Sequence, residues 1–326
     1  MRNNCWRGPL LTILLLASLH RLASADPLAS WHEGPAKAAI LDFLKRVTTE
    51  GAPGFLPPEE RIATFDNDGT LWCEKPDYVE VVFAVDRLKA LAPDHPEWRK
   101  QEPFATILKD EGRETLTLKD YVELVVATHA GMTSEDFDKI VTAWFATARH
   151  PRFDRPYTAC VYQPMLEVLT LFRAHGFQTF IVSGGGAEFM RPWTQKTYGV
   201  PRNQVVGSTI NTEFKLTDNR PALLRLPKID FIDDGPGKPV SIGKFIGRRP
   251  IAAFGNSDGD VAMLEWTTLA EGPRLGMLVH HTDSEREYAY DRKSHVGRLS
   301  KGLDEAPRRG WTVIDMRQEW KTIFPE

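Results

Sequence analysis

The sequence predicts an α/β fold, a doubly wound parallel sheet with helices on both faces and a helical segment inserted into it. Short apolar strands alternate with helices in two parts of the 326-residue chain, which is typical of a parallel sheet. Between these parts, residues 73–160 show helical spacing and little strand character. The net charge of −3 gives no reason to expect a nucleic acid or an anionic membrane as a partner.

Each expected element rests on apolar periodicity bounded by Gly, Pro or polar turn residues. The expected strands are 61–65, 177–182, 205–207, 251–254, 275–279 and 311–314. The expected helices are 36–47, 79–91, 118–129, 137–146, 164–174, 188–198, 238–246 and 261–266. Residues 209–232 suit a hairpin that turns at Asp218-Asn219.

The N-terminus predicts a cleavable signal peptide over residues 1–25. Arg2 and Arg7 precede an apolar run of about ten residues, which is half of what a membrane span needs, and Ala23-Ser24-Ala25 forms a small-x-small cleavage site. Cleavage after Ala25 removes three arginines and no acid, so the net charge falls from −3 to −6. We therefore expect a periplasmic or secreted protein with no stable membrane anchor.

Polar or glycine-rich turns follow three of the expected strands. The carboxyl ends of parallel strands share one crevice, so these turns are expected to converge. Asp66 and Asp68 follow the first strand, and two carboxylates at this spacing could act as a nucleophile and as a proton donor and acceptor. An isolated Asp-x-Asp turn is more often a structural turn, so the remaining motifs carry the argument.

The ordered set of motifs resembles the haloacid dehalogenase superfamily, and within it the phosphoserine-phosphatase-like phosphatases. The motifs are Asp66-Asn67-Asp68-Gly69-Thr70, Ser183-Gly184-Gly185, Lys238, and residues 255–264 beginning with Gly255-Asn256. The resemblance covers residues 60–285. It implies a Rossmann-like core of residues 26–72 and 161–326, with an α-helical cap domain at 73–160.

The resemblance also implies a mechanism. Asp66 would attack phosphorus to form an aspartyl-phosphate, and Asp68 would protonate the leaving alcohol and then activate water. Ser183 and the Gly184 N–H would hold phosphoryl oxygens, while Lys238 would neutralise their charge. The expected ligands of the Mg²⁺ cofactor are the Asp66 carboxylate, the Asp68 main-chain carbonyl, and Asn256 and Asp260 of the last motif. The expected substrate is a small phosphomonoester.

One position departs from the family pattern. Asn256 stands where the family usually has Asp, so the metal site loses a negative charge, and Asp258 is an additional acid that could offset the loss. Lys244 competes with Lys238 for the lysine role, although Gly237-Lys238-Pro239 better matches the start of a helix.

Several alternatives stay open on the sequence. A dehalogenase would need neither a metal nor Asp68, whereas a phosphotransferase would use the same residues. An exported binding protein with a decayed site is the non-enzymatic alternative, and Asn256 is the residue that favours it. Specificity is expected to come from the cap, with Trp72 and Glu74 as plausible substrate contacts.

Three further expectations concern other parts of the chain. His280 and His281 follow a strand and are more often surface residues than site residues, and 286–292 suits a solvated face. Cys73 and Cys160 bracket the helical insertion, so a disulfide between them and a pair of buried thiols are nearly equal alternatives.

Overall fold

The computed structural model describes residues 26–109 and 117–326. The expected signal peptide lies outside these residues. In the described part of the chain the strands form one eight-stranded sheet in the order β4-β3-β2-β1-β5-β6-β7, with β8 beside β6. The strands are β1 (Ile62–Phe65), β2 (Gln178–Gly186), β3 (Val205–Thr217), β4 (Arg220–Phe231), β5 (Ala252–Gly255), β6 (Leu275–Thr282), β7 (Ala289–Tyr290) and β8 (Thr312–Asp315).

The pairing confirms a doubly wound sheet. The neighbours β3-β2-β1-β5-β6-β8 run parallel, and β4 and β7 are antiparallel additions at the two sides. All four residues of β1 are buried, as expected of a central strand that is covered on both faces. Phe65 of β1 stacks on Phe254 of β5 with ring centroids 4.5 Å apart, which closes the centre of the core.

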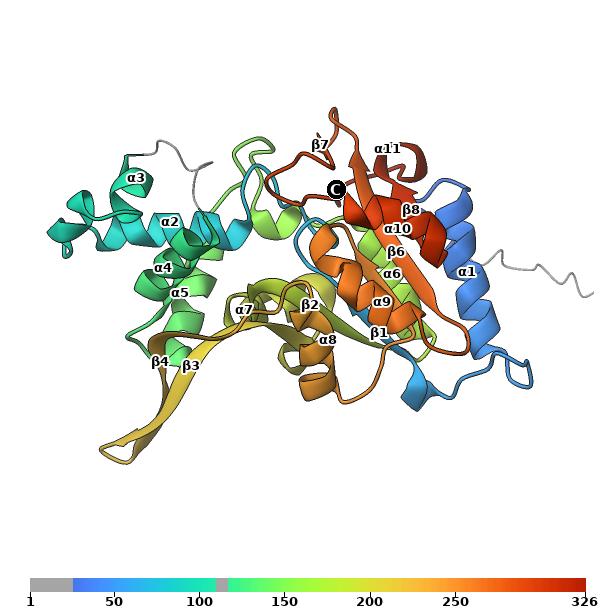
Figure 1. Cartoon of the computed structure of the whole chain (residues 1–326), viewed down its shortest axis with the longest axis horizontal. Coiled ribbons are helices and arrows are strands. Elements are labelled where there is room, and N and C mark those ends of the chain that lie inside the picture. The colour runs from blue at the N-terminus through green and yellow to red at the C-terminus, as the bar shows by residue number, and fades with distance from the viewer. Residues whose placement is uncertain (1–25, 110–116) are drawn as a thin grey trace, which may run out of the picture.

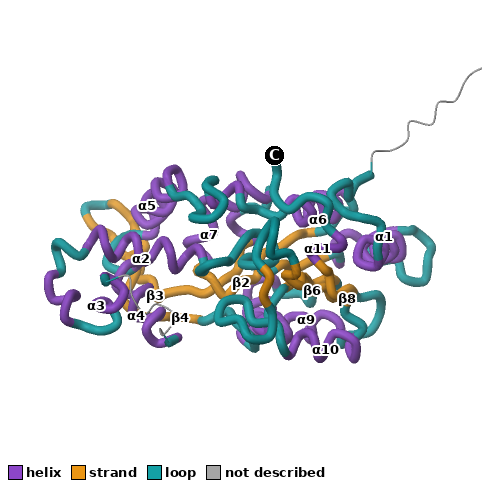
Figure 2. Tube along the Cα trace, turned by 90° about the horizontal axis from the view of Figure 1, so that it is seen from above, coloured by secondary structure: helices purple, strands orange, loops and turns teal. Residues whose placement is uncertain are grey.

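Helices cover both faces of the sheet, as Figure 2 shows from above. One layer contains α1 (Pro35–Thr48), α6 (Gln163–Ala174) and α7 (Ala187–Tyr198), and the other contains α9 (Val261–Thr268) and α10 (Lys301–Arg309). Helix α8 (Gly237–Ser241) packs against α9. Successive side chains of a strand point to opposite faces, so Ala63 and Phe65 join the core beneath α1 while Ile62 joins the core beneath α9.

The inserted segment is helical, and it packs against a long hairpin (Figure 1). Its helices are α2 (Val79–Leu91), α3 (Phe104–Leu108), α4 (Leu118–His129) and α5 (Ser134–Thr147). The hairpin β3–β4 turns at Asp218 and Asn219, whose φ angles of 50° and 60° suit the mirror-image turns that connect twisted strands. Backbone hydrogen bonds tie β4 to the loop before α5, with Arg225 N–H donating to the Met132 carbonyl (2.9 Å).

The insertion leaves and rejoins the sheet through two adjacent connections, as the disulfide hypothesis required, but no disulfide forms. Cys73 N–H donates to the Cys160 carbonyl (3.0 Å), yet both residues are buried free thiols. The physical reason is side-chain direction. The Cys73 thiol donates to Glu287 Oε1 (3.0 Å), whereas the Cys160 thiol points to the Pro156 carbonyl (3.6 Å).

Two further differences from the sequence-based expectations bear on the site. β2 continues through Ser183 to Gly186 instead of ending at residue 182. Residues 286–292 are not simply a solvated face, because Glu287 is fully buried and Tyr290 forms part of β7. Among the helices of the described residues, none is long and apolar enough to cross a bilayer.

The free thiols make a simple prediction for the chain from residue 26 onward. Without reductant, alkylation of the folded protein should be slow, because burial raises the pKa of Cys160 to about 12 and that of Cys73 above its usual value. Unfolding in denaturant should then allow two alkyl groups to add per chain, measured by intact mass. A protein that takes up none after unfolding would contain the disulfide.

Candidate active site

The first strand delivers Asp66 to the carboxyl edge of the sheet. Its N–H donates to the Phe254 carbonyl (2.9 Å), which continues the pairing of β1 with β5. One carboxylate oxygen accepts a hydrogen bond from Lys238 Nζ (2.7 Å). Burial and the neighbouring Asp260 raise the pKa of Asp66 well above its usual value, and Lys238 opposes this rise. Asp66 therefore needs positive charge beside it to act as a carboxylate.

Lys238 lies at the centre of the site and is fully buried. Its ammonium donates three hydrogen bonds, to Asp66 Oδ1 (2.7 Å), Asp260 Oδ1 (2.6 Å) and the Val182 carbonyl (3.0 Å). Burial on its own would lower the pKa of Lys238, but the two carboxylates raise it above its usual value, so the side chain stays charged. Lys244, the competing candidate, is exposed and lies over the Phe231 ring.

Asp260 is the second carboxylate that contacts Lys238. Its side chain is fully buried, and its second oxygen accepts from the main-chain N–H groups of Asn256 (2.9 Å) and Ser257 (3.0 Å). Both carboxylate oxygens are thus engaged with the chain itself. Asp260 thus positions Lys238 and the loop after β5. Its role as a direct metal ligand, which the resemblance implies, stays a prediction.

Asp68 faces the same pocket as Asp66. Trp72 Nε1 donates to its Oδ1 (2.9 Å), and Trp72 is itself held by stacking on Trp193 with ring centroids 4.4 Å apart. Trp72 therefore orients Asp68, a role that differs from the substrate contact expected from the sequence. Burial is the main reason that the pKa of Asp68 rises to about 6. Both its protonated and its ionised forms are then available near neutral pH.

The end of β2 completes the pocket. Ser183 is buried, its Oγ accepts from the Gly185 N–H (3.2 Å), and the Gly184 carbonyl accepts from the Ser208 hydroxyl (2.7 Å). A pocket of about 280 Å³, hereafter the active-site pocket, brings together five residues that the sequence singled out. They are Asp66, Asp68, Ser183, Gly184 and Lys238.

Asn256 lies deeper and is paired with an acid from the inserted segment. Its Oδ1 accepts from the Thr70 hydroxyl (2.9 Å), and its Nδ2 donates to Glu74 Oε1 (2.8 Å). Gly69 passes so close that a Cβ there would lie 2.1 Å from Asn256 Nδ2, and its φ of 74° also favours glycine. Burial raises the pKa of Glu74 well above its usual value.

The acid that stands beside Asn256 is therefore Glu74 and not Asp258. The expectation that Asp258 offsets the missing charge is wrong, because its Oδ1 accepts from the N–H groups of Ser300 (2.9 Å) and Gly302 (3.0 Å) at the start of α10. From the sequence, Glu74 is expected only as a substrate contact. The sequence feature that could have indicated a role in the site is its position two residues after Trp72, in the connection that leads out of the first motif.

The donor chemistry of this region fits Mg²⁺. Asp66, Asp68 and Glu74 line the active-site pocket with carboxylate oxygens, and oxygen is the donor atom that Mg²⁺ prefers. In the part of the chain that the structure describes, no group of three or more His, Cys, Asp or Glu side chains could hold a metal ion. A bound cation would therefore need main-chain and amide oxygens as well, as the Asp68 carbonyl and Asn256 Oδ1 could provide.

His281, in the C-terminal part of the chain, contacts the loop of residues 66–70, hereafter the catalytic loop. It is buried, its Nε2 lies 2.7 Å from the Gly69 carbonyl, and its Nδ1 lies 3.3 Å from Glu287 Oε2. The expectation of a surface histidine is therefore wrong for His281. Sequence reasoning missed Glu287 because it belongs to a run that looks solvent-exposed.

Comparison with known proteins now identifies the family. A model for haloacid dehalogenase-like hydrolases matches residues 63–265, more than half of the chain, including every residue of the active-site pocket. The chain belongs to the haloacid dehalogenase-like hydrolase family. The family resemblance inferred from the motifs is thereby confirmed. No curated protein sequence matches the chain.

Several solved structures are similar to this chain. A protein of unknown function from Anaerococcus prevotii has a TM-score of 0.51 at 16% identity, over 76% of this chain and 86% of that one. A protein of unknown function from Bordetella pertussis scores 0.48 at 17% identity, over 79% and 99%. A phosphoserine phosphohydrolase-like protein from Francisella tularensis scores 0.37 at 14% identity, over 76% and 98%. At 16% identity, the likeness to the Anaerococcus prevotii protein concerns the fold alone.

The raised pKa of Asp68 predicts a pH-dependent cost to stability of the metal-free hydrolase. Because the folded pKa of about 6 exceeds the unfolded value of 3.8, the folded state loses stability as pH rises through this window. Asp68→Asn removes the buried charge, so at pH 8 in EDTA it should raise the free energy of unfolding by up to about 3 kcal/mol. At pH 3.5 the gain should disappear. Urea unfolding at both pH values measures it, and an equal effect at both would contradict the assignment.

Proposed function

We propose that this hydrolase is a Mg²⁺-dependent phosphatase that cleaves small phosphomonoesters through an aspartyl-phosphate on Asp66. The observation that carries the proposal is the convergence of Asp66, Asp68, Ser183, Gly184 and Lys238 in one pocket. A carboxylate nucleophile, a second carboxyl group with a pKa of about 6, and a buried ammonium are the groups that phosphoryl transfer to and from an aspartate requires.

In the first step an Asp66 oxygen attacks phosphorus, and the bond from phosphorus to the ester oxygen breaks. Protonated Asp68 gives its proton to that oxygen, so the leaving group departs as a neutral alcohol. In the second step Asp68, now ionised, takes a proton from water. The resulting hydroxide oxygen attacks phosphorus and the bond to Asp66 breaks, which releases phosphate and restores both carboxyl groups.

The remaining residues act on charge and orientation. Lys238 offsets the negative charge of Asp66 and of the phosphoryl oxygens, and Ser183 and the Gly184 N–H would donate to those oxygens. Mg²⁺, held by Asp66, the Asp68 carbonyl and Asn256, would add positive charge at the phosphoryl group. The helices between β1 and β2 would act as a cap that covers the pocket, since Glu80 of α2 and Tyr121 of α4 line it.

We also propose that the protein is exported after cleavage at Ala25.

The nucleophile is tested first. The mature protein should hydrolyse 4-nitrophenyl phosphate in the presence of Mg²⁺, and Asp66→Asn should reduce turnover at least ~10³-fold, because an amide oxygen cannot form the intermediate. Circular dichroism should show that the variant stays folded. Lys244→Ala, an exposed lysine of the same region, is the matched control and should keep full activity. Undiminished turnover in Asp66→Asn would contradict the mechanism.

The pairing of Asn256 with Glu74 makes a second prediction. Asn256→Asp should lower the Mg²⁺ concentration at half-saturation, because it adds a negative charge to the site. Without metal it should lower the melting temperature, because two carboxylates would then face each other where Asn256 Nδ2 now lies 2.8 Å from Glu74 Oε1. Thermal melts with and without Mg²⁺ measure both effects.

The double variant Asn256→Asp/Glu74→Gln keeps one acid and one amide at these two positions. It should recover the metal-free melting temperature of the wild type. Identical Mg²⁺ dependence of the wild type and Asn256→Asp would instead show that Asn256 does not contact the metal.

A further inference from the structure

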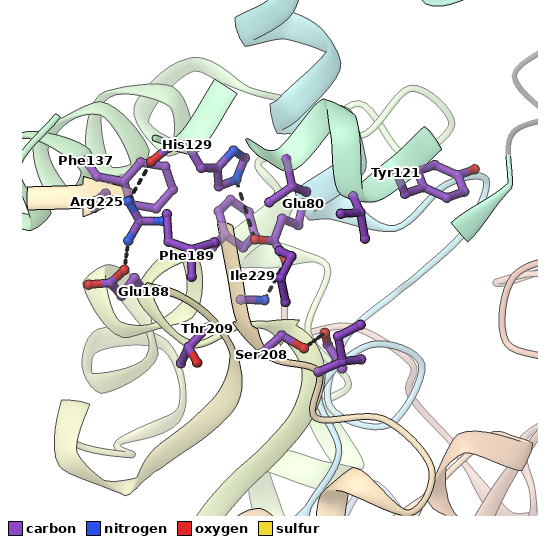
Figure 3. Close-up of a pocket in the computed structure, with 16 residues that line it drawn as sticks. Glu80, Tyr121, His129, Phe137, Glu188, Phe189, Ser208, Thr209, Arg225 and Ile229 are labelled. Carbon is purple, nitrogen blue, oxygen red and sulfur yellow. Dashed lines mark hydrogen bonds and ion pairs between the residues drawn. The ribbon is translucent and has the colours of Figure 1, made fainter. Parts of the chain in front are cut away.

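A second pocket adjoins the active-site pocket, and Figure 3 shows the residues that line it. Its volume is about 160 Å³, and it lies between the inserted helices and the β3–β4 hairpin. The two pockets share residues of their lining, so they adjoin one another. The shared residues are Glu80, Tyr121, Val125, Gly184 and Ile232. We refer to this second space as the side pocket.

The walls of the side pocket are mainly apolar. Helix α4 contributes Val122 and Val125, α5 contributes Phe137, and α7 contributes Phe189. The hairpin supplies the opposite wall through Ile210, Ile229 and the adjoining Ile232. An apolar wall of this kind stabilises an apolar group that leaves water, by about 0.8 kcal/mol for each buried CH₂ in general.

The charged residues at the far end already have partners. Arg225 forms an ion pair with Glu188, donates from Nε to the His129 carbonyl (2.6 Å), and lies over the Phe137 ring at 4.0 Å. Its charge is therefore offset within the protein. The arrangement of these side chains around the pocket is visible in Figure 3.

The acid at the junction of the two pockets is also engaged. Glu80 Oε2 accepts from the Gly186 N–H (2.6 Å), and Glu80 Oε1 lies 3.6 Å from His129 Nε2. The Ser208 hydroxyl donates to the Gly184 carbonyl (2.7 Å). The Ser208 hydroxyl and the Glu80 carboxylate thus have hydrogen-bond partners within the chain, whereas His129 Nε2 and Arg225 Nη1 make ion-pair contacts and no hydrogen bond. The rest of the lining is mainly apolar and would contact the ligand.

The size of the side pocket limits what can enter. A buried apolar cavity of about 150 Å³ is large enough to hold benzene. The side pocket, at about 160 Å³, has room for one six-membered ring or a short branched aliphatic group. It is too small for two linked ring systems, such as the base and the sugar of a nucleoside.

We infer that the side pocket binds the leaving group of the substrate, and that this group is apolar and about the size of one ring. The inference rests on the proposed phosphatase function. With the phosphate at Asp66 and Ser183, the ester oxygen faces Asp68, and the alcohol portion extends past Gly184 and Tyr121 into the side pocket. The substrate class is then the phosphate monoesters of aromatic or short aliphatic alcohols.

The test compares benzyl phosphate with phosphoethanolamine. Both are esters of primary alcohols, so differences in kcat/KM report on binding of the leaving group more than on its intrinsic reactivity. Burial of the ring should give benzyl phosphate at least a ~30-fold advantage in kcat/KM. An equal or higher value for phosphoethanolamine would overturn the inference, because it would mean that Glu80 selects an ammonium group.

A pair of variants on α4 tests whether the preference for benzyl phosphate depends on the side pocket. Val122 lines the side pocket but not the active-site pocket, and Val126, one turn further along the same helix, lines neither. Val122→Trp should fill the side pocket and reduce the ratio of kcat/KM for benzyl phosphate over phosphoethanolamine at least ~10-fold. Val126→Trp is the matched control and should leave this ratio unchanged. Equal ratios in both variants and in the wild type would contradict the assignment.

A binding measurement separates this inference from the proposed function. Benzylphosphonate and 2-aminoethylphosphonate cannot be hydrolysed at the carbon–phosphorus bond, and calorimetry gives their affinities directly. If neither ester is turned over, the proposed function fails, while tighter binding of benzylphosphonate that Val122→Trp weakens would still support the side pocket. If the esters are turned over without preference for the ring, the side-pocket inference fails alone.

Discussion

The three hydrogen bonds of the Lys238 ammonium connect the parts of the sheet on which the site depends. They join the carbonyl of Val182 in β2, the carboxylate of Asp66 after β1, and that of Asp260 after β5. A buried charge without partners is strongly destabilising, so the lysine and its two acids stabilise the fold only as a set. In the proposed mechanism, the same set would hold the nucleophile in place and supply the positive charge that a phosphoryl group needs.

A second layer of residues holds the catalytic loop from the side of the insertion and of the C-terminus. Trp72 orients Asp68, Glu74 pairs with Asn256, and His281 contacts the Gly69 carbonyl while Glu287 supports it. The Glu74–Asn256 and His281–Gly69 contacts join segments that lie far apart in the sequence. The loop is thereby fixed by buried polar contacts, which are costly to break one at a time.

The inserted helices and the β3–β4 hairpin determine what can approach the nucleophile. The hairpin continues from β3, a strand of the main sheet, and its second strand packs on α4 and α5. The space beside the catalytic groups is thus bounded by both units. If the proposals hold, the sheet edge would carry out the chemistry, and the inserted helices and the hairpin would select the leaving group.

The amino-acid sequence was enough to predict the α/β class, most helices and strands, and the meeting of Asp66, Asp68, Ser183, Gly184 and Lys238. These features follow from local apolar periodicity and from the rule that parallel strands end at the same sheet edge. The roles of Asp258, Asp260 and Glu74, the free thiols of Cys73 and Cys160, and the burial of Glu287 required the folded chain. They depend on where side chains point among residues as much as 214 positions apart, as for Cys73 and Glu287, and local sequence does not encode such directions.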